Sequence, residues 1–178
     1  ASLAVNGVCL TAVTIEGEQV LADIGPETAR ITTLGAIRAG ARVNLERPMR
    51  IDGRLDGHFV LGHVDGVGAV LAVRDEADSR WVTVEYPDAL APYFIRKGSV
   101  AVDGVSLTIV DLAEGSFNIQ VIPYTWSHTA LGDRRPGARR HPDPQVARGE
   151  PQPLDRGPAI EARGVRRRVD ERDLAVLV

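Results

Sequence analysis

The chain has 178 residues, a formal net charge of −3, and a composition that is 44% hydrophobic but only 4% aromatic. These totals allow one globular domain, or two small ones, with a core of Val, Leu, Ile and Ala. They give no reason to expect binding to nucleic acid or to an acidic membrane, and no apolar run is long enough to span a bilayer. The single cysteine, Cys9, excludes an internal disulfide and favours the reducing cytoplasm.

A tandem repeat dominates the sequence. Residues 2–13 (SLAVNGVCLTAV) and 99–110 (SVAVDGVSLTIV) are identical at eight of twelve positions, with an offset of 97. The same offset aligns Pro26 with Pro123, Thr28 with Thr125, Thr32 with Thr129, Leu34 with Leu131, and Gly35 with Gly132. We therefore predict a duplicated unit, the first over residues 1–89 and the second over residues 90–139.

In chain order, the predicted elements are mostly short strands. Residues 8–24 form two β-rich runs around Glu16-Gly17, as in a hairpin, and residues 108–122 repeat this pattern around Glu114-Gly115. Further strands are predicted within residues 41–48, 61–75 and 80–87, and one short helix within residues 87–99. So many short strands predict an all-β fold, a tandem pair of small antiparallel barrels or sandwiches.

The C-terminal segment differs from the rest. Residues 133–178 hold 11 of the 20 arginines and 6 of the 11 prolines, but no aromatic residue apart from histidine. The repeat breaks at Arg140, where RHPDPQ replaces a strand-like run; proline cannot donate a ladder hydrogen bond inside a sheet. We predict a poorly structured Arg/Pro-rich tail over residues 140–178. A natural disordered tail and a frameshifted or chimeric end both fit.

Five separated motifs resemble riboflavin synthases, the family with two lumazine-binding repeats. They are VNGVCLT (5–11), NLERP (44–48), GHFVLGHVDG (57–66), KGSVAVDGVSLT (97–108) and IPYTWSHTALG (122–132). The resemblance covers roughly residues 2–139 and implies two Greek-key β-barrels. It also implies a cytoplasmic homotrimer held by a C-terminal helix, with possible association with lumazine synthase.

The resemblance further implies one reaction, without cofactor or metal. Two molecules of 6,7-dimethyl-8-ribityllumazine react by transfer of a four-carbon unit, giving riboflavin and 5-amino-6-(D-ribitylamino)uracil. A duplicated pocket suits this reaction, because it holds two copies of one molecule at reacting distance. In the family, the first barrel of one chain faces the second barrel of another.

Departures from the family pattern concern the two ends of the chain. The family's opening strand is missing, and its apolar C-terminal helix is replaced. We therefore expect poor activity, and a chain that is monomeric or aggregates through an unpaired strand edge. The rival interpretations are a non-catalytic lumazine- or flavin-binding antenna protein and an inactive fragment.

Small hydroxyl residues and exposed backbone suit a flat heterocycle rich in carbonyls, although they are also ordinary in strands. By resemblance, the substrate-binding residues of the first unit are Cys9, Leu10, Thr11, Asp23, Ile24, Gly25, Pro26, Glu27 and Thr28. Those of the second unit are Ser106, Leu107, Thr108, Gln120, Val121, Ile122, Pro123, Tyr124 and Thr125. Asn44, Gly62, His63, Val64 and Lys97 complete the predicted site.

The candidate catalytic residues are His63, Ser106 and Cys9. The reaction removes a proton from the C7 methyl group, and an imidazole titrating near neutrality suits that step, so His63 is the predicted base or proton shuttle. A structural hydrogen bond in a Gly-rich turn is the alternative role for His63. Cys9 is either a nucleophile or a small apolar residue. A metal site is not expected, because His58 and His63 on one strand would face opposite sides.

Overall fold

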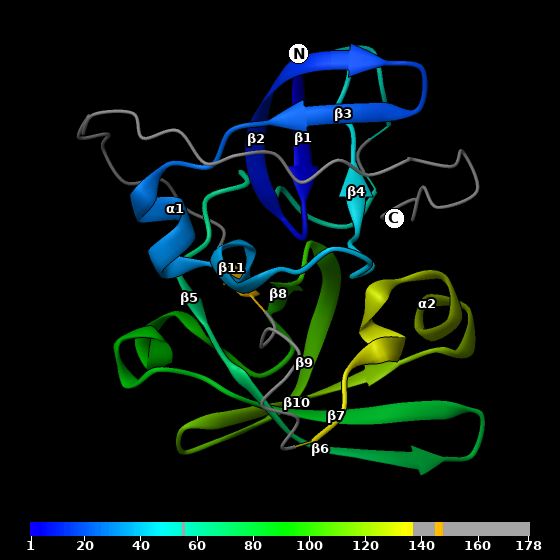
Figure 1. Ribbon diagram of the computed structural model, residues 1–178. Coiled ribbons are helices and arrows are strands. Elements are labelled where there is room, and N and C mark those ends of the chain that lie inside the picture. The colour runs from blue at the N-terminus through cyan, green and yellow to red at the C-terminus, as the bar shows by residue number, and fades with distance from the viewer. Residues whose placement is uncertain (55, 137–144, 148–178) are drawn as a thin grey trace.

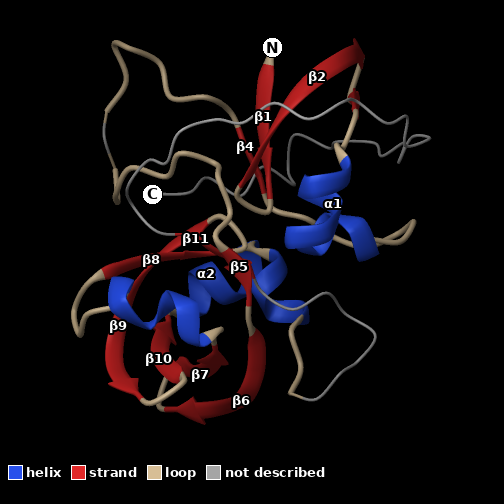
Figure 2. Ribbon diagram, turned by 90° about the vertical axis from the view of Figure 1, so that its left-hand side faces the viewer, coloured by secondary structure: helices blue, strands red, loops and turns tan. Residues whose placement is uncertain are grey.

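The computed structural model describes residues 1–54, 56–136 and 145–147, and these fold mainly into antiparallel strands (Figures 1 and 2). The predicted all-β class is confirmed. The strands form two sheets, one of four strands and one of seven. In Figure 1 the four-stranded sheet lies at the top and the seven-stranded sheet below it.

The first unit, residues 1–48, carries the four-stranded sheet. Its elements are β1 (Ser2–Val5), β2 (Val8–Glu16), β3 (Gln19–Ala22), α1 (Pro26–Ile31), the 3₁₀ helix η1 (Thr33–Ala36) and β4 (Leu45–Glu46). The strand order is β3-β2-β1-β4, and β2 and β3 form the hairpin predicted around Glu16-Gly17.

The second unit, residues 66–147, carries the seven-stranded sheet. It contains β5 (Gly66–Val67), β6 (Ala69–Glu76), β7 (Ser79–Glu85), the 3₁₀ helix η2 (Asp88–Tyr93), β8 (Ser99–Val102), β9 (Val105–Ala113), β10 (Ser116–Val121), α2 (Pro123–His128), the 3₁₀ helix η3 (Ala130–Asp133) and β11 (Gln145–Ala147). The order is β5-β11-β8-β9-β10-β7-β6.

This sheet closes into a Greek-key barrel. Its two outermost strands, β5 and β6, are separated only by Gly68, so they are one bent strand that joins both ends of the sheet. The strand β7 pairs with β10 rather than with β8, and β11 pairs with β8 rather than with β10. These two crossovers are the connections of a Greek key.

The repeat seen in the sequence is also a repeat of structure. Each of β1, β2, β3, α1 and η1 has a counterpart that begins 97 residues later, namely β8, β9, β10, α2 and η3. The helices were not predicted from the sequence. Both α1 and α2 have proline at their start, where the missing N–H has no intrahelical partner to lose.

Two features differ from the sequence predictions. The strands β5 to β7 were placed in the first unit, but they belong to the sheet of the second, so the boundary lies between β4 and β5 rather than at residue 89. The strand β11 lies in the predicted tail, where it begins just after Pro144 and pairs with β5 and β8. The remainder of that predicted tail, 140–144 and 148–178, lies outside the described residues.

Each unit has its own core, and the two cores differ in size. In the second unit, 14 buried residues form one cluster, in which Tyr86 and Phe94 pack on Phe117 with ring centroids 5.9 and 5.2 Å away. The core cluster around the first unit has four buried residues, Val8, Leu10, Leu34 and Val64. The seven-stranded barrel is therefore the better-packed half of the fold.

The two copies of the repeat meet at their tight turns. Asn6-Gly7 joins β1 to β2 and Asp103-Gly104 joins β8 to β9, and all four residues have positive φ, as in type I′ turns. A Cβ on Gly104 would lie 2.6 Å from the backbone nitrogen of Gly7. The two turns therefore touch backbone to backbone, and only glycine fits at this contact.

Among the described residues, no helix combines the length and apolar character needed to cross a membrane.

Candidate functional site

The predicted contact residues on β2 and β9 divide between two faces. Cys9 and Thr11 are exposed on one face of β2, and Leu10 between them is buried in the core of the first unit. On β9, Ser106 is half-buried and Thr108 exposed, and Leu107 packs against the core of the second unit. The strand alternation thus presents one thiol or hydroxyl pair on each unit, and the two leucines serve packing.

The predicted segment Asp23 to Thr28 connects β3 to α1 and forms the first turn of that helix. Asp23, Gly25, Pro26 and Glu27 are exposed there, whereas Ile24 packs against the core. Glu27 pairs with Arg30 through two hydrogen bonds of 2.8 and 2.5 Å, and this contact holds the pKa of the Glu27 carboxyl below its ordinary value.

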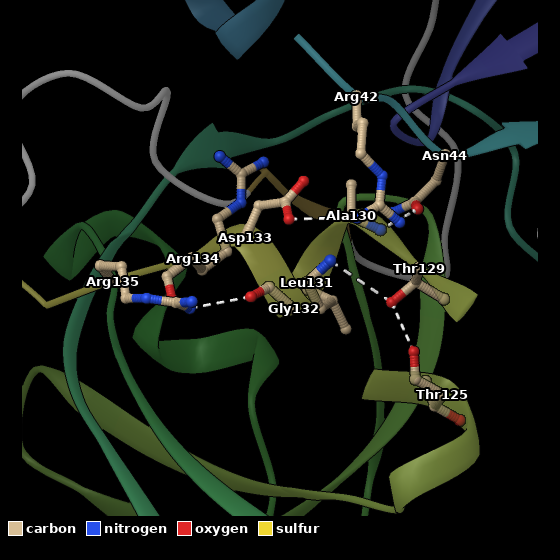
Figure 3. Close-up of polar contacts among 10 residues, drawn as sticks. All are labelled: Arg42, Asn44, Thr125, Thr129, Ala130, Leu131, Gly132, Asp133, Arg134 and Arg135. Atoms are coloured by element: carbon tan, nitrogen blue, oxygen red, sulfur yellow. Dashed lines mark hydrogen bonds and ion pairs between the residues drawn. The ribbon is translucent and has the colours of Figure 1, made fainter. Parts of the chain in front are cut away.

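The equivalent segment of the second unit, Gln120 to Thr125, ends β10 and opens α2. Val121 is fully buried, but Ile122, Pro123 and Tyr124 are exposed and offer an apolar and aromatic surface. The Tyr124 ring stacks on His128, with centroids 4.0 Å apart. Thr125 accepts a 2.8 Å hydrogen bond at its carbonyl from the hydroxyl of Thr129 (Figure 3).

A cavity of about 610 Å³ lies beside the first unit. Its lining comes from three places: β1, the exposed thiol of β2, and the irregular segment that follows β4. The lining includes Cys9, Met49, His58, Phe59 and Gly62. This volume falls within the usual range of small-molecule sites, roughly 300–1,000 Å³.

Cys9 and Gly62, both predicted site residues, are in direct contact. The Cys9 amide donates a 2.9 Å hydrogen bond to the Gly62 carbonyl, and a Cβ on Gly62 would lie 2.4 Å from the Cys9 Cβ. Gly62 has a φ of +80°, which favours glycine. The segment after β4 therefore runs directly against β2 in the lining of the cavity.

The side chains of His58 and Ser106 are in direct contact. The His58 Nδ1 lies 2.7 Å from the Ser106 Oγ, and His58 also lines the cavity. Burial lowers the pKa of the His58 imidazole, so its neutral form is favoured. A neutral imidazole that is hydrogen-bonded to a hydroxyl can accept a proton through that hydroxyl. This contact of His58 is not predicted from the sequence.

The predicted catalytic histidine, His63, is exposed and is not among the residues that line the cavity. The sequence predicts no metal site, because His58 and His63 would lie on opposite faces of one strand. Residues 58–65 instead form irregular structure. Val64 is buried in the first core. In the described part of the chain, no group of three or more His, Cys, Asp or Glu side chains could hold a metal ion.

Lys97 and Asn44 have different surroundings. Lys97 is exposed on the turn before β8, with a φ of +67°, and its amide donates to the carbonyl of Ile109. Asn44 is buried between the units: its Nδ2 donates 2.9 Å to the carbonyl of Asp103, and its Oδ1 accepts 2.7 Å from the amide of Ala130 (Figure 3). Asn44 therefore acts on the relative placement of the units, not on the surface of either site.

No signal along the sequence could have identified His58. The motif GHFVLGHVDG contains two histidines, and nothing along the chain distinguishes them. The choice depends on a contact across 48 positions, from His58 to Ser106. Only the fold supplies that contact.

Comparison with known proteins agrees with this architecture. The model of the lumazine binding domain family matches residues 1–48 and 61–140, which contain all the described strands except β11. Riboflavin synthase from Actinobacillus pleuropneumoniae is 41% identical over 137 residues, which are 77% of this chain and 64% of that protein. Riboflavin synthase from Chlamydia muridarum is 39% identical over 145 residues, 82% of this chain and 71% of that protein.

Solved structures show the same similarity. Crystal structures of LumP complexed with riboflavin and with 6,7-dimethyl-8-(1'-D-ribityl) lumazine match with TM-scores of 0.74 and 0.71 and identities of 26% and 25%. The first alignment covers 83% of this chain and 77% of LumP, the second 82% and 76%. The chain spans 64% of the length of the Actinobacillus relative.

Proposed function

This chain belongs to the riboflavin synthase family of lumazine-binding proteins, and we propose that it acts as a riboflavin synthase. In the proposed reaction, one molecule of 6,7-dimethyl-8-ribityllumazine gives a four-carbon unit to a second. The products are riboflavin and 5-amino-6-(D-ribitylamino)uracil. The two structurally repeated units support this proposal, because the reaction needs two sites for one kind of molecule.

The observation that carries the proposal is the hydrogen bond between His58 and Ser106. The reaction begins with loss of a proton from the C7 methyl group of a lumazine. A neutral imidazole 2.7 Å from a hydroxyl can take up that proton through the hydroxyl. The lowered pKa of His58 favours the neutral form that this step needs.

The exposed residues around each hydroxyl or thiol provide the rest of the proposed site. Cys9 and Thr11 of β2, Thr108 of β9 and Tyr124 of α2 are assigned to ligand contact because they are exposed and lie on elements that the repeat shares. Lys97 and His63 are exposed as well, and we assign them to the ligand bound by a neighbouring chain. The proposed assembly is a cytoplasmic homotrimer, weaker in this chain than that expected for the family, that can associate with lumazine synthase.

A binding protein without turnover is the second candidate, favoured by the similarity to LumP, whose structures hold riboflavin or lumazine. In this chain, however, the polar faces occur on both units: Cys9 and Thr11 on β2, and Ser106 and Thr108 on β9. Two such faces are needed for two reacting molecules, whereas a carrier needs one.

The test compares matched positions of the repeat. The full chain and its Ser106→Ala, His58→Gln and Cys9→Ala variants are mixed with 6,7-dimethyl-8-ribityllumazine, and riboflavin is followed by absorbance. Loss of the Ser106 hydroxyl or the His58 imidazole is expected to lower the rate about 100-fold or more, as for loss of a general base. Cys9→Ala is expected to lower it less than about tenfold. Wild-type rates in the Ser106→Ala variant would contradict the proposed mechanism.

A further inference from the structure

We infer that Arg134 is a positioning residue for the proposed catalytic pair, acting through the buried carboxylate of Asp103. Asp103 has no exposed surface and Arg134 is only 7% exposed. The Arg134 Nε donates a 2.8 Å hydrogen bond to Asp103 Oδ2, and its Nη2 contacts the same oxygen. Arg134 ends the 3₁₀ helix η3, so this ion pair ties η3 to the β8–β9 turn.

The turn held by this ion pair leads directly to the proposed catalytic hydroxyl. Asp103 and Gly104 are its two central residues, and Ser106 follows two positions later, paired in register with Ala101. A shift of the turn therefore moves the start of β9 and the hydroxyl it carries. The 2.7 Å contact with His58 depends on that placement, because His58 comes from an irregular segment.

The repeat shows how the first unit holds the equivalent turn without an ion pair. Asn6 stands where Asp103 stands in the second unit, and Ile37 where Arg134 stands. The Asn6 Oδ1 accepts from the Asn44 amide at 2.8 Å, and its own amide donates to the Asn44 carbonyl at 2.8 Å. The buried ion pair between Arg134 and Asp103 thus occurs in the unit that carries Ser106.

Arg134 and the adjacent Arg135 differ in the groups to which their guanidinium groups donate. Arg135 is exposed, and its guanidinium donates to the carbonyls of Gly132 and Arg134 (Figure 3). In Figure 3 the Arg135 side chain extends along η3 toward Gly132. Arg135→Ile is therefore a matched control for Arg134→Ile: the same change, one position away, without the buried carboxylate.

The test reads the His58 imidazole by NMR and needs no ligand, so its failure is separate from failure of the proposed enzyme activity. Ser106→Ala defines the resonances of His58 without its partner. Arg134→Ile is expected to move the His58 resonances toward those of Ser106→Ala, and Arg134→Lys is expected to give a smaller shift. Arg135→Ile is expected to leave them at the wild-type position.

Arg134→Ile leaves a buried carboxylate without its arginine and can lose the fold. The double variant Asp103→Asn, Arg134→Ile has the residues of the first unit at these two positions and removes the buried charge. The same NMR measurement of His58 is therefore made on this variant. Its His58 resonances are expected to match those of Ser106→Ala. Wild-type resonances in this folded variant would overturn the inference and leave Arg134 with a purely stabilising role.

Kinetics add a second measurement, which rests on the proposed function. A displaced hydroxyl slows the chemical step more than it weakens binding. In the double variant, kcat is therefore expected to fall about tenfold or more, with KM within about twofold of the wild-type value. Equal changes in the Arg135→Ile control would contradict the inference.

Discussion

His58 is the residue at which the two units and the cavity come together. It lies on the segment between the sheets, lines the cavity beside Cys9, and contacts Ser106 of the second unit. Its burial opposes the charged imidazolium form. The neutral imidazole that burial favours is therefore also the form that the proposed proton transfer needs.

The pH dependence of stability follows from the lowered pKa of His58. The unfolded chain binds a proton near the ordinary histidine pKa of about 6.5, before the folded chain does. The contribution of His58 to the free energy of unfolding is therefore present above that pH and is lost as the pH falls toward the folded-state pKa. Urea unfolding at about pH 8 and pH 5.5 should show a larger loss for wild type than for His58→Gln.

The control for this experiment is His63→Gln, which removes an exposed imidazole from the same segment. It should keep the wild-type difference between the two pH values. Glu46, which is half-buried, has the opposite effect on the free energy of unfolding. Burial raises the pKa of its carboxyl, so the folded chain binds a proton more readily than the unfolded chain as the pH falls toward the carboxyl range. An equal loss of stability in wild type and His58→Gln would contradict the account of His58.

At the scale of elements, the contact between the two tight turns fixes how the repeats meet. Gly7 and Gly104 combine positive φ with an approach of backbone to backbone. Gly17, in the β2–β3 turn, also has positive φ, at +58°, but a Cβ there would meet nothing within 4 Å. The chain thus offers a comparison that separates backbone strain from close packing.

Gly104→Ala is expected to destabilise the protein by about 2–4 kcal/mol, the sum of left-handed strain and overpacking. Gly17→Ala carries the strain alone and is expected to cost about 1 kcal/mol. Chemical denaturation of both variants measures the difference. Equal losses would show that the turns do not press together in solution.

Much of the element pattern could be predicted from the sequence. The hairpins around Glu16-Gly17 and Glu114-Gly115 depend on local turn chemistry and alternation, and both form as predicted. The helices α1 and α2 were missed because Pro26 and Pro123 were interpreted as ligand-contacting positions and not as helix starts. The signal was present, since proline is favoured in the first helical turn.

At the scale of the molecule, the two units have unequal cores. The cluster in the seven-stranded barrel has 14 buried residues, whereas that around the four-stranded sheet has four. Opening of the first unit therefore exposes less apolar surface to water than opening of the second. Local opening should be easier there.

Hydrogen exchange can test this inequality at positions matched by the repeat. Hydrogen-bonded amides of β2 (Val8–Glu16) are expected to exchange at least about tenfold faster than those of β9 (Val105–Ala113), a difference of about 1.4 kcal/mol in opening free energy. Each amide is compared with the one 97 positions later. Equal protection would show that the units open only together.

The boundary between the units could not be predicted, for a physical reason. Residues 66–85 carry a strand pattern, but the pattern does not say which sheet they join. That choice depends on long-range pairing, such as Val84 with Phe117 and Val82 with Ile119, which buries these side chains in the larger core. The contact of His58 with Ser106 was hidden for the same reason.

A mass balance tests most directly the proposal that this chain joins two copies of one substrate. The protein is incubated with 6,7-dimethyl-8-ribityllumazine alone, and the substrate consumed and products formed are quantified by chromatography. The account predicts two lumazines consumed for each riboflavin and each 5-amino-6-(D-ribitylamino)uracil formed. Saturable binding of lumazine with no riboflavin formed would contradict it and indicate a binding protein.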